Sequence, residues 1–200
     1  MKLCYLVLCC CLPFAVQAQG LYPEYGEVSL SGGLSFNKPI LSSGDMNSGA
    51  IASFRYLRHF GGVAAGVGYE QAHIEAGSMS MFENKVNVNM SPLRTISMSL
   101  STKVHGLSGY LYYGGSLGYS WGQAAKNGAK NAVKGLSLGG NFGYALRVAP
   151  WLSLTGEVSP RANILGFKSD SMVGDERVQE DEKMMVLSVP LQLGIRVRVR

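Results

Sequence analysis

Beyond residue 11 the sequence has no cysteine, because all four cysteines (Cys4, Cys9, Cys10 and Cys11) lie in one N-terminal segment. The rest of the chain therefore has no disulfide framework and no cysteine-based metal site. Charged residues are also scarce, at 16%, and the formal net charge is +5. A positive charge this small and this scattered argues against nucleic-acid binding.

Long apolar runs are missing as well, apart from residues 3–16. This run follows the cation Lys2 and ends in Val16, Gln17 and Ala18, which suit positions −3 to −1 of a signal-peptidase site. It is shorter than the roughly 20 residues that a transmembrane helix needs. We therefore predict a signal peptide over residues 1–18 and a single domain over residues 19–200.

The remaining sequence alternates apolar residues with small or polar ones, which is the period of a β-strand. In the last segment, for example, Leu191 and Leu193 flank Gln192. Five segments alternate cleanly: residues 27–36, 110–121, 136–148, 152–159 and 189–200. Three weaker segments cover residues 50–57, 63–73 and 96–100, the last limited by Pro92 and Arg94. We predict eight strands, with a bulge or local break at Pro190, which cannot donate a backbone hydrogen bond.

The connections between these segments alternate in length. Short ones fall around residues 58–62, 104–107 and 149–151, and long ones cover residues 37–49, 75–93, 122–134 and 165–183. Short turns at one end and long loops at the other are typical of transmembrane β-barrels. The predicted fold is all-β: a closed, antiparallel, up-and-down transmembrane barrel of about eight strands, with short periplasmic turns and four longer outer loops.

Alternation alone does not show which face points inward. A soluble, lipocalin-like barrel would turn its apolar face inward, and an outer-membrane barrel would turn it outward. An arginine facing lipid near the midplane costs about 2–4 kcal/mol, whereas inside a narrow lumen it can pair with a carboxylate. The charges share the face that is rich in serine and glycine, so we predict a lumen charge network of Glu27, Arg55, Glu70, Arg147, Glu157, Arg161, Arg196 and Arg198.

The aromatic residues form two groups, as expected for girdles at two membrane interfaces. Near the short-turn side lie Tyr22, Tyr25, Tyr56, Phe60, Tyr110 and Trp151. Near the long-loop side lie Phe36, Tyr69, Tyr119 and Trp121.

The last strand resembles the C-terminal strand signal of outer-membrane barrels through Gln192, Gly194, Val197 and Val199. Such signals usually end in an aromatic residue, and this chain ends in Val199 and Arg200. From about residue 24 onward the chain resembles the small eight-stranded barrels of the porin-like and OmpA- or OmpX-like families. The resemblance implies an outer-membrane location, contact with outer-membrane lipid, insertion by the barrel-assembly machinery and long loops outside the cell.

Side chains that could carry chemistry are few. Catalysis by a barrel of this kind needs a nucleophile, a base and an orienting acid together, and no such set surrounds His59, His73 or His105. We place His59 and His105 in short turns, with exposed or interfacial roles. The sequence therefore predicts no catalytic site, no cofactor and no metal site.

The leading functional hypothesis is a structural or surface-interaction barrel, with a lumen largely plugged by Arg/Glu pairs. Its outer loops differ in charge and could meet an extracellular partner of unknown kind. Three alternatives stay open: a narrow pore for small solutes, a soluble periplasmic ligand-binding barrel, and a lipid-modifying barrel enzyme with His73 as its main candidate.

Overall fold

The computed structural model describes residues 24–39, 47–81, 84–126, 129–173 and 176–199, and every element in them is a β-strand. The predicted signal peptide lies outside the described residues. Among those described, no helix has the length and hydropathy of a membrane-spanning one. The strands form one antiparallel sheet: β1 (Tyr25–Pro39), β2 (Asn47–Phe60), β3 (Val63–Met81), β4 (Asn84–His105), β5 (Gly109–Lys126), β6 (Ala129–Ala149), β7 (Leu152–Val158), β8 (Arg161–Val173) and β9 (Glu176–Val199).

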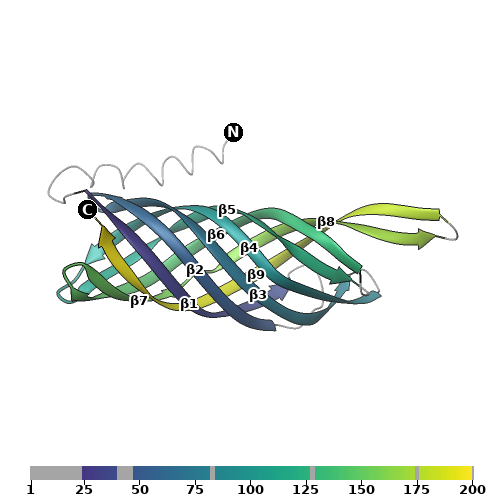
Figure 1. Cartoon of the computed structure of the whole chain (residues 1–200), viewed down its shortest axis with the longest axis horizontal. Coiled ribbons are helices and arrows are strands. Elements are labelled where there is room, and N and C mark those ends of the chain that lie inside the picture. The colour runs from purple at the N-terminus through teal and green to yellow at the C-terminus, as the bar shows by residue number, and fades with distance from the viewer. Residues whose placement is uncertain (1–23, 40–46, 82–83, 127–128, 174–175, 200) are drawn as a thin grey trace.

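This sheet closes into a barrel, because β1 also pairs with β9 from Gly26 opposite Val199 to Pro39 opposite Val186 (Figure 1). Strands β2 to β6 each pair with their neighbours in chain order. The segments β7 and β8 occupy one position in the ring, since both lie between β6 and β9. The barrel therefore has eight strand positions, and the predicted all-β, up-and-down barrel is confirmed.

The interruption between β7 and β8 is caused by proline. Pro160 has no N–H to donate, although its carbonyl still accepts a hydrogen bond from the Gly140 N–H at 2.9 Å. The predicted local break at Pro190 occurs on one side of β9 only. Against β1 the strand runs on without a register shift, with Ser35 opposite Pro190, but pairing with β7 ends at Leu191 and pairing with β8 begins at Ser188. Pro190 therefore lies opposite the interruption between β7 and β8, and its carbonyl accepts a hydrogen bond from the Ser159 N–H at 3.1 Å.

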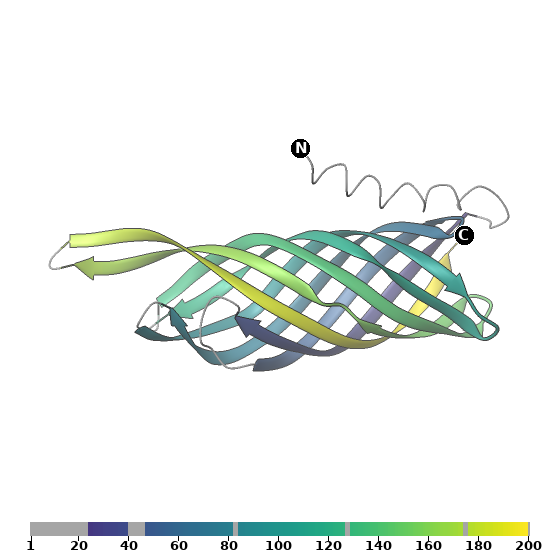
Figure 2. The ribbon, with the colours of Figure 1, turned by 180° about the vertical axis from the view of Figure 1, so that it is seen from behind.

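The strands extend further than the alternation predicts. The predicted long loops over residues 75–93, 122–134 and 165–183 are mostly continuations of β3 to β6, β8 and β9 as paired hairpins. β4 passes through Pro92 with a register shift between Met90 and Arg94 instead of starting near residue 96. The β8–β9 hairpin projects well beyond the rest of the barrel (Figures 1 and 2). Outside a bilayer neither face has to be apolar, so paired strands can continue where the alternation ends.

The short connections lie at the end where β1 begins and β9 ends. Between β2 and β3 the chain turns at Gly61 and Gly62, and Gly61 has φ of 63°, a value that favours glycine. The other two turns join β4 to β5 and β6 to β7. The opposite end carries the extended hairpins of β3–β4, β5–β6 and β8–β9.

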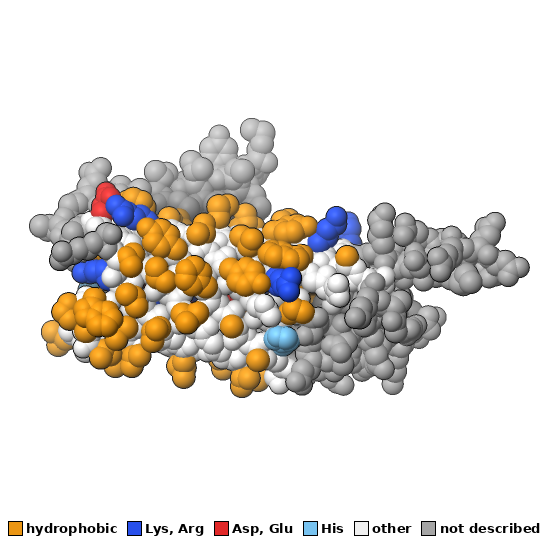
Figure 3. Space-filling model, in the orientation of Figure 1, with side chains coloured by type: hydrophobic (Ala, Val, Ile, Leu, Met, Phe, Trp, Pro, Cys, Tyr) orange, Lys and Arg blue, Asp and Glu red, His pale blue; other side chains and the backbone are white. Residues whose placement is uncertain are grey.

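The apolar face of the sheet is outside. Leucine, isoleucine, valine and aromatic side chains cover the barrel as a broad belt (Figure 3), and Leu138 and Leu193 are 63% and 77% exposed. The inward face is mostly serine, glycine and charged residues, and Ser29, Ser53, Ser101 and Ser137 are buried. A lipocalin-like barrel would have the reverse arrangement.

Candidate functional site: the charged lumen

The lumen is the only place where the described residues gather buried charge. The strand pleat sends alternate side chains inward, and the small residues on that face leave room for a few long ones. Six of the eight residues predicted for the lumen network form ion pairs there, and they come from six strands: Glu27 on β1, Arg55 on β2, Glu70 on β3, Glu157 on β7, Arg161 on β8 and Arg196 on β9.

Arg196 lies between the two carboxylates at the centre of this network. Its Nη1 is 3.9 Å from Oε2 of Glu27, and its Nη2 is 3.5 Å from Oε2 of Glu157. The guanidinium carbon lies 3.8 Å from the centre of the Tyr112 ring, a cation–π arrangement. The Arg196 residue is 4% exposed, so its charge is compensated by protein groups rather than by bulk water.

Glu27 is surrounded by three further groups. Lys103 Nζ lies 3.0 Å from Oε1 of Glu27, and His59 Nε2 lies 3.0 Å from Oε2. The Tyr110 hydroxyl donates to the same carboxylate at 3.1 Å, and its ring centre is 4.0 Å from Lys103 Nζ. One carboxylate thus joins β1 to β2, β4 and β5.

Glu157 forms a second cluster deeper in the barrel. Arg55 Nη1 donates to Glu157 Oε1 at 2.5 Å, the Tyr112 hydroxyl donates to Oε2 at 3.0 Å, and the Ser159 hydroxyl also donates to Oε1. A separate pair joins Arg161 to Glu70 in the bidentate geometry that makes arginine–carboxylate pairs strong, with Nη2 to Oε2 at 2.8 Å.

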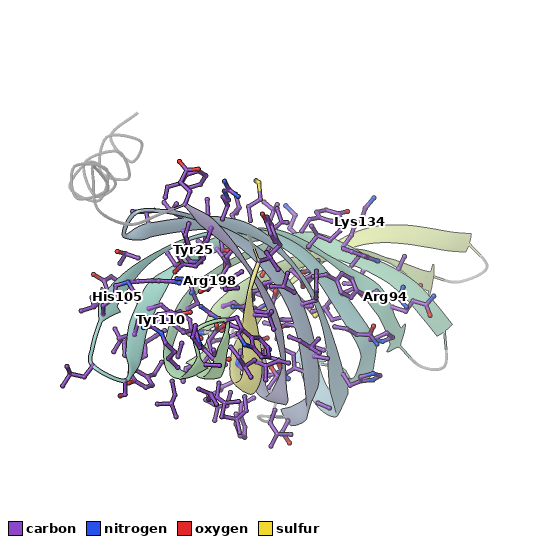
Figure 4. The ribbon with its side chains drawn as sticks, turned by 60° about the vertical axis from the view of Figure 1, so that its left-hand side comes forward. Tyr25, Arg94, His105, Tyr110, Lys134 and Arg198 are labelled. Carbon is purple, nitrogen blue, oxygen red and sulfur yellow. The ribbon has the colours of Figure 1, made fainter. Side chains whose placement is uncertain are left out.

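Arg147 and Arg198 share the inward parity but lie at the barrel end. Both are exposed, and neither forms an ion pair among the described residues. The Arg198 guanidinium covers the Tyr25 ring at 3.8 Å, close to Tyr110 and His105 at the short-turn end (Figure 4). The predicted lumen network therefore extends further toward this end than the ion pairs do.

The residues of the C-terminal strand signal lie in β9. Gln192 points into the lumen, where its Oε1 accepts hydrogen bonds from Ser31 at 3.1 Å and from Ser53 at 3.2 Å. Gly194 faces Ser31 in the β1 register. Val197 and Val199 alternate with the inward Arg196, which places them on the outer face.

Four lumen residues are missing from the sequence prediction. His59 was predicted in an exposed or interfacial turn but is 1% exposed, because β2 continues to Phe60. Tyr110 was predicted in the outer girdle but points inward against Glu27. Tyr112 shares the parity of the serine- and glycine-rich face but was not predicted as part of the charge network, and Lys103 was not predicted there either. Parity could have identified Lys103, which lies two residues after the inward Ser101. Tyr22 of the girdle prediction lies outside the described residues.

Two small cavities lie among the charged side chains of the lumen. One cavity of about 20 Å³ lies beside Arg55, Glu70, Asn141 and Arg161, and another of about 10 Å³ lies beside Tyr25, Arg147 and Arg198. A water molecule needs roughly 10–15 Å³ of such space, so each cavity suits about one water. In the part of the chain that the structure describes, no three His, Cys, Asp or Glu side chains are placed to share a metal ion.

Neither a protein-family model nor a curated protein sequence matches the chain, but solved structures share its fold. Neisserial surface protein A aligns with a TM-score of 0.59 and 14% identity over 88% of this chain and 99% of that one. A major outer membrane protein from Thermus thermophilus aligns with a TM-score of 0.53 and 14% identity over 89% and 100%. Ail, the attachment invasion locus protein of Yersinia pestis, in complex with the heparin analogue sucrose octasulfate, aligns with a TM-score of 0.50 and 13% identity over 87% and 99%.

The chain therefore has the fold of the small outer-membrane β-barrels, with an apolar outer belt and a charged interior. The resemblance found in the sequence is confirmed at the level of fold.

Proposed function

We propose that this chain is an outer-membrane protein with a structural or surface-interaction role, whose lumen is closed to solutes by its own paired charges. The outer-membrane placement is supported by the closed sheet, which leaves no strand edge in lipid, and by the exposed apolar belt. The fold shared with neisserial surface protein A and Ail supports the same placement.

The observation that carries the closed lumen is the position of Arg196. It contacts carboxylates from β1 and β7 and stacks on a ring from β5, so these contacts cross the lumen from several sides. The two cavities beside these ion pairs have room for about one water each. A solute could pass only if several buried ion pairs opened at once.

Planar-bilayer recording tests the closure. We expect no steady conductance step from the purified wild-type barrel. We expect steps from Arg55→Ala/Tyr112→Ala/Arg196→Ala, because that variant removes the side chains packed around Glu157. Arg198→Ala is the control, since its guanidinium lies over Tyr25 at the barrel end. Steady steps and solute uptake into liposomes with the wild-type protein would instead support the narrow-pore alternative.

Cell fractionation tests the placement. The protein should remain with the outer membrane, require detergent for extraction, and change its gel mobility on heating. Release without detergent would contradict the placement and return the soluble binding barrel as the better hypothesis. The proposal also includes insertion by the barrel-assembly machinery, so depletion of that machinery should reduce the folded, heat-sensitive gel band.

We place the surface role at the end of the barrel that carries the extended hairpins. The β8–β9 hairpin extends beyond the barrel there (Figure 2), and the Ail structure contains a bound heparin analogue. An extracellular partner that meets these hairpins fits such an arrangement. Cells carrying a barrel with shortened hairpins should adhere less to host or matrix surfaces if this role is correct, and unchanged adhesion would argue for a structural role alone.

The proposal assigns no catalysis to the barrel. His59 is enclosed beside Glu27 and Tyr25, away from the lipid face where a lipid-modifying site would lie. His73, the candidate of the enzyme alternative, is exposed near the long-loop end of β3. Lipid turnover by the purified protein that is lost in His73→Ala would contradict this part of the proposal.

A further inference from the structure

We infer that the outer face of β4, β5 and β6 binds one phosphorylated lipid, with its phosphate between Arg94 and Lys134 and an acyl chain in a groove at Gly115. The inference rests on the proposed membrane placement and adds to it a defined lipid site. Two independent features of the same three strands support it.

The first feature is a pair of cations on the outer surface. Arg94 lies opposite Trp121 in the register of β4 and β5, and Trp121 lies opposite Lys134 in the register of β5 and β6. Two strand spacings separate the cations, roughly 10 Å between their Cα atoms, so both long side chains can reach one phosphate. Both are exposed, and neither has a carboxylate partner among the described residues.

The position of this pair matches the level of lipid headgroups. Arg94 and Lys134 lie toward the long-loop end of the barrel, away from Tyr25, His105 and Arg198 (Figure 4). The Trp121 ring between them lies 6.4 Å from the Tyr119 ring and 6.5 Å from the Tyr69 ring. Aromatic side chains of this kind gather at the membrane–water interface, where cations attract anionic headgroups.

The second feature is an apolar groove of about 560 Å³ further along the same strands. Gly115 lines the groove, and Gly140 lies opposite it in the β5–β6 register, so two neighbouring positions of the outer face have no side chain. Met98, Leu100, Tyr113, Leu117 and Leu138 form its walls. Met98 follows Arg94 by four residues, roughly 13 Å of strand. A chain that descends from a headgroup at Arg94 therefore reaches the groove.

A phosphorylated lipid satisfies both features at once. The groove opens within the apolar belt, where the surrounding medium is hydrocarbon, and it faces no other part of the protein. A neutral lipid would fill the groove but leave the cations without a partner, and free phosphate would contact the cations but leave the groove empty. The site therefore selects for a molecule that joins a phosphate to an acyl chain.

Native mass spectrometry of the purified barrel in detergent micelles tests this site with three probes. Dioleoyl phosphatidic acid carries both parts, dioleoylglycerol lacks the phosphate, and glycerol 3-phosphate lacks the chains. We expect one phosphatidic acid retained per barrel and neither of the other probes. Retention of dioleoylglycerol to the same degree, or of glycerol 3-phosphate alone, would overturn the inference.

Two double variants test the cation pair and the groove separately. Arg94→Gln/Lys134→Gln should weaken phosphatidic acid binding roughly thirtyfold, since each cation contributes to headgroup attraction. Gly115→Val/Gly140→Val should weaken it by filling the groove. A Cβ at these positions would meet backbone oxygens only at 3.8 and 3.5 Å, so the barrel can accept the change.

Matched controls use the same chemistry elsewhere on the barrel. Lys38→Gln/Arg58→Gln removes two cations outside the site, and Gly32→Val/Gly156→Val adds side chains at positions where a Cβ would again meet nothing closer than 3.5 Å. Equal losses in the site and control variants would overturn the inference. Heat-dependent gel mobility verifies that each variant is folded. The proposed membrane placement is tested separately by fractionation, so the two can fail independently.

Discussion

At the scale of single residues, the interior depends on long side chains placed among short ones. Glu27, Glu157 and Arg196 are buried by nearly the whole of their surface, and each touches groups from more than one strand. A buried charge is tolerable only when partners compensate it. Removing one partner should therefore lower the free energy of unfolding by more than the ion pair contributes to it, because the other charge stays buried without compensation.

Arg196→Met tests this asymmetry. In this variant both carboxylates keep one cation, Lys103 for Glu27 and Arg55 for Glu157. We therefore expect the free energy of unfolding to fall by about 3 kcal/mol, the lower end of the range for breaking a buried ion pair. The measurement is urea unfolding in lipid vesicles followed by tryptophan fluorescence. Arg198→Met, at the exposed mouth, should change the midpoint little. An Arg196→Met barrel as stable as the wild type would show that the network does not stabilise the fold.

Gly143 provides a second residue-scale test. It lies opposite Tyr112 in the β5–β6 register, and a Cβ there would collide with the Tyr112 ring and approach the Gly156 carbonyl oxygen at 2.7 Å. Gly143→Ala should therefore displace Tyr112 from Glu157 and lower the free energy of unfolding by about 1–3 kcal/mol, as overpacking usually does. Gly115→Ala is the matched control, because a Cβ there meets nothing closer than 3.8 Å. Equal unfolding midpoints for the two variants would contradict the packing described here.

At the scale of elements, the barrel wall and the hairpins are distinct parts of the same strands. β8 pairs with β6 only as far as Phe167, and β9 pairs with β1 only from Val186 onward. Between these points the two strands pair with each other alone. The projecting part of the hairpin therefore adds nothing to the closure of the ring.

Removal of that projection should leave the barrel intact. We propose to delete residues 168–181 and to join Phe167 to Glu182, which lie opposite each other, through an Asn-Gly turn. The shortened protein should keep its heat-dependent gel mobility, and its thermal midpoint should stay within a few degrees. A barrel that no longer folds would show that the hairpin takes part in assembly, in contrast to its pairing.

The same elements show how far the sequence predicts the fold. Strand positions within the bilayer follow from alternation, because one face must be apolar and the other must not. The outer ends of β3 and β4 are not predictable in this way, because water surrounds both faces there. His59 was misplaced for a related reason: near the barrel end the strand and the turn have similar compositions, and only pairing shows where β2 ends. Tyr110 was assigned to the girdle because it is aromatic, although alternation in residues 110–121 gives it the parity of the inward face.

The charge pairs were harder to predict than the inward face. Parity gives the side of the sheet on which Arg55 and Arg161 lie, but their partners depend on shear, which sets how far each strand is shifted around the ring. Arg55 meets Glu157 across the lumen, and Arg161 meets Glu70. No local pattern in the sequence encodes these distances of 102 and 91 residues along the chain.

At the scale of the whole molecule, the outer belt determines the medium in which the protein is stable. Leu138→Arg places a cation on the exposed belt, next to Leu117 in the register. A change of this kind costs about 2–4 kcal/mol near the bilayer midplane, and we expect that loss in vesicle unfolding. Ser116→Thr, on the inward face of the same region, is a mild control. A Leu138→Arg protein that is equally stable and more soluble without detergent would mean that the belt faces water.

The pairing of β1 with β9 also sets the order in which the chain can assemble. Gly26 and Val199 become neighbours only when the last strand arrives, so until then the growing sheet has two open edges, each able to recruit another chain. Contacts this distant in sequence also form slowly. A chain truncated within β9 should thus be more than a weakened barrel: it would be an open template for self-association, and the cell would need to hold or destroy it before it met another copy.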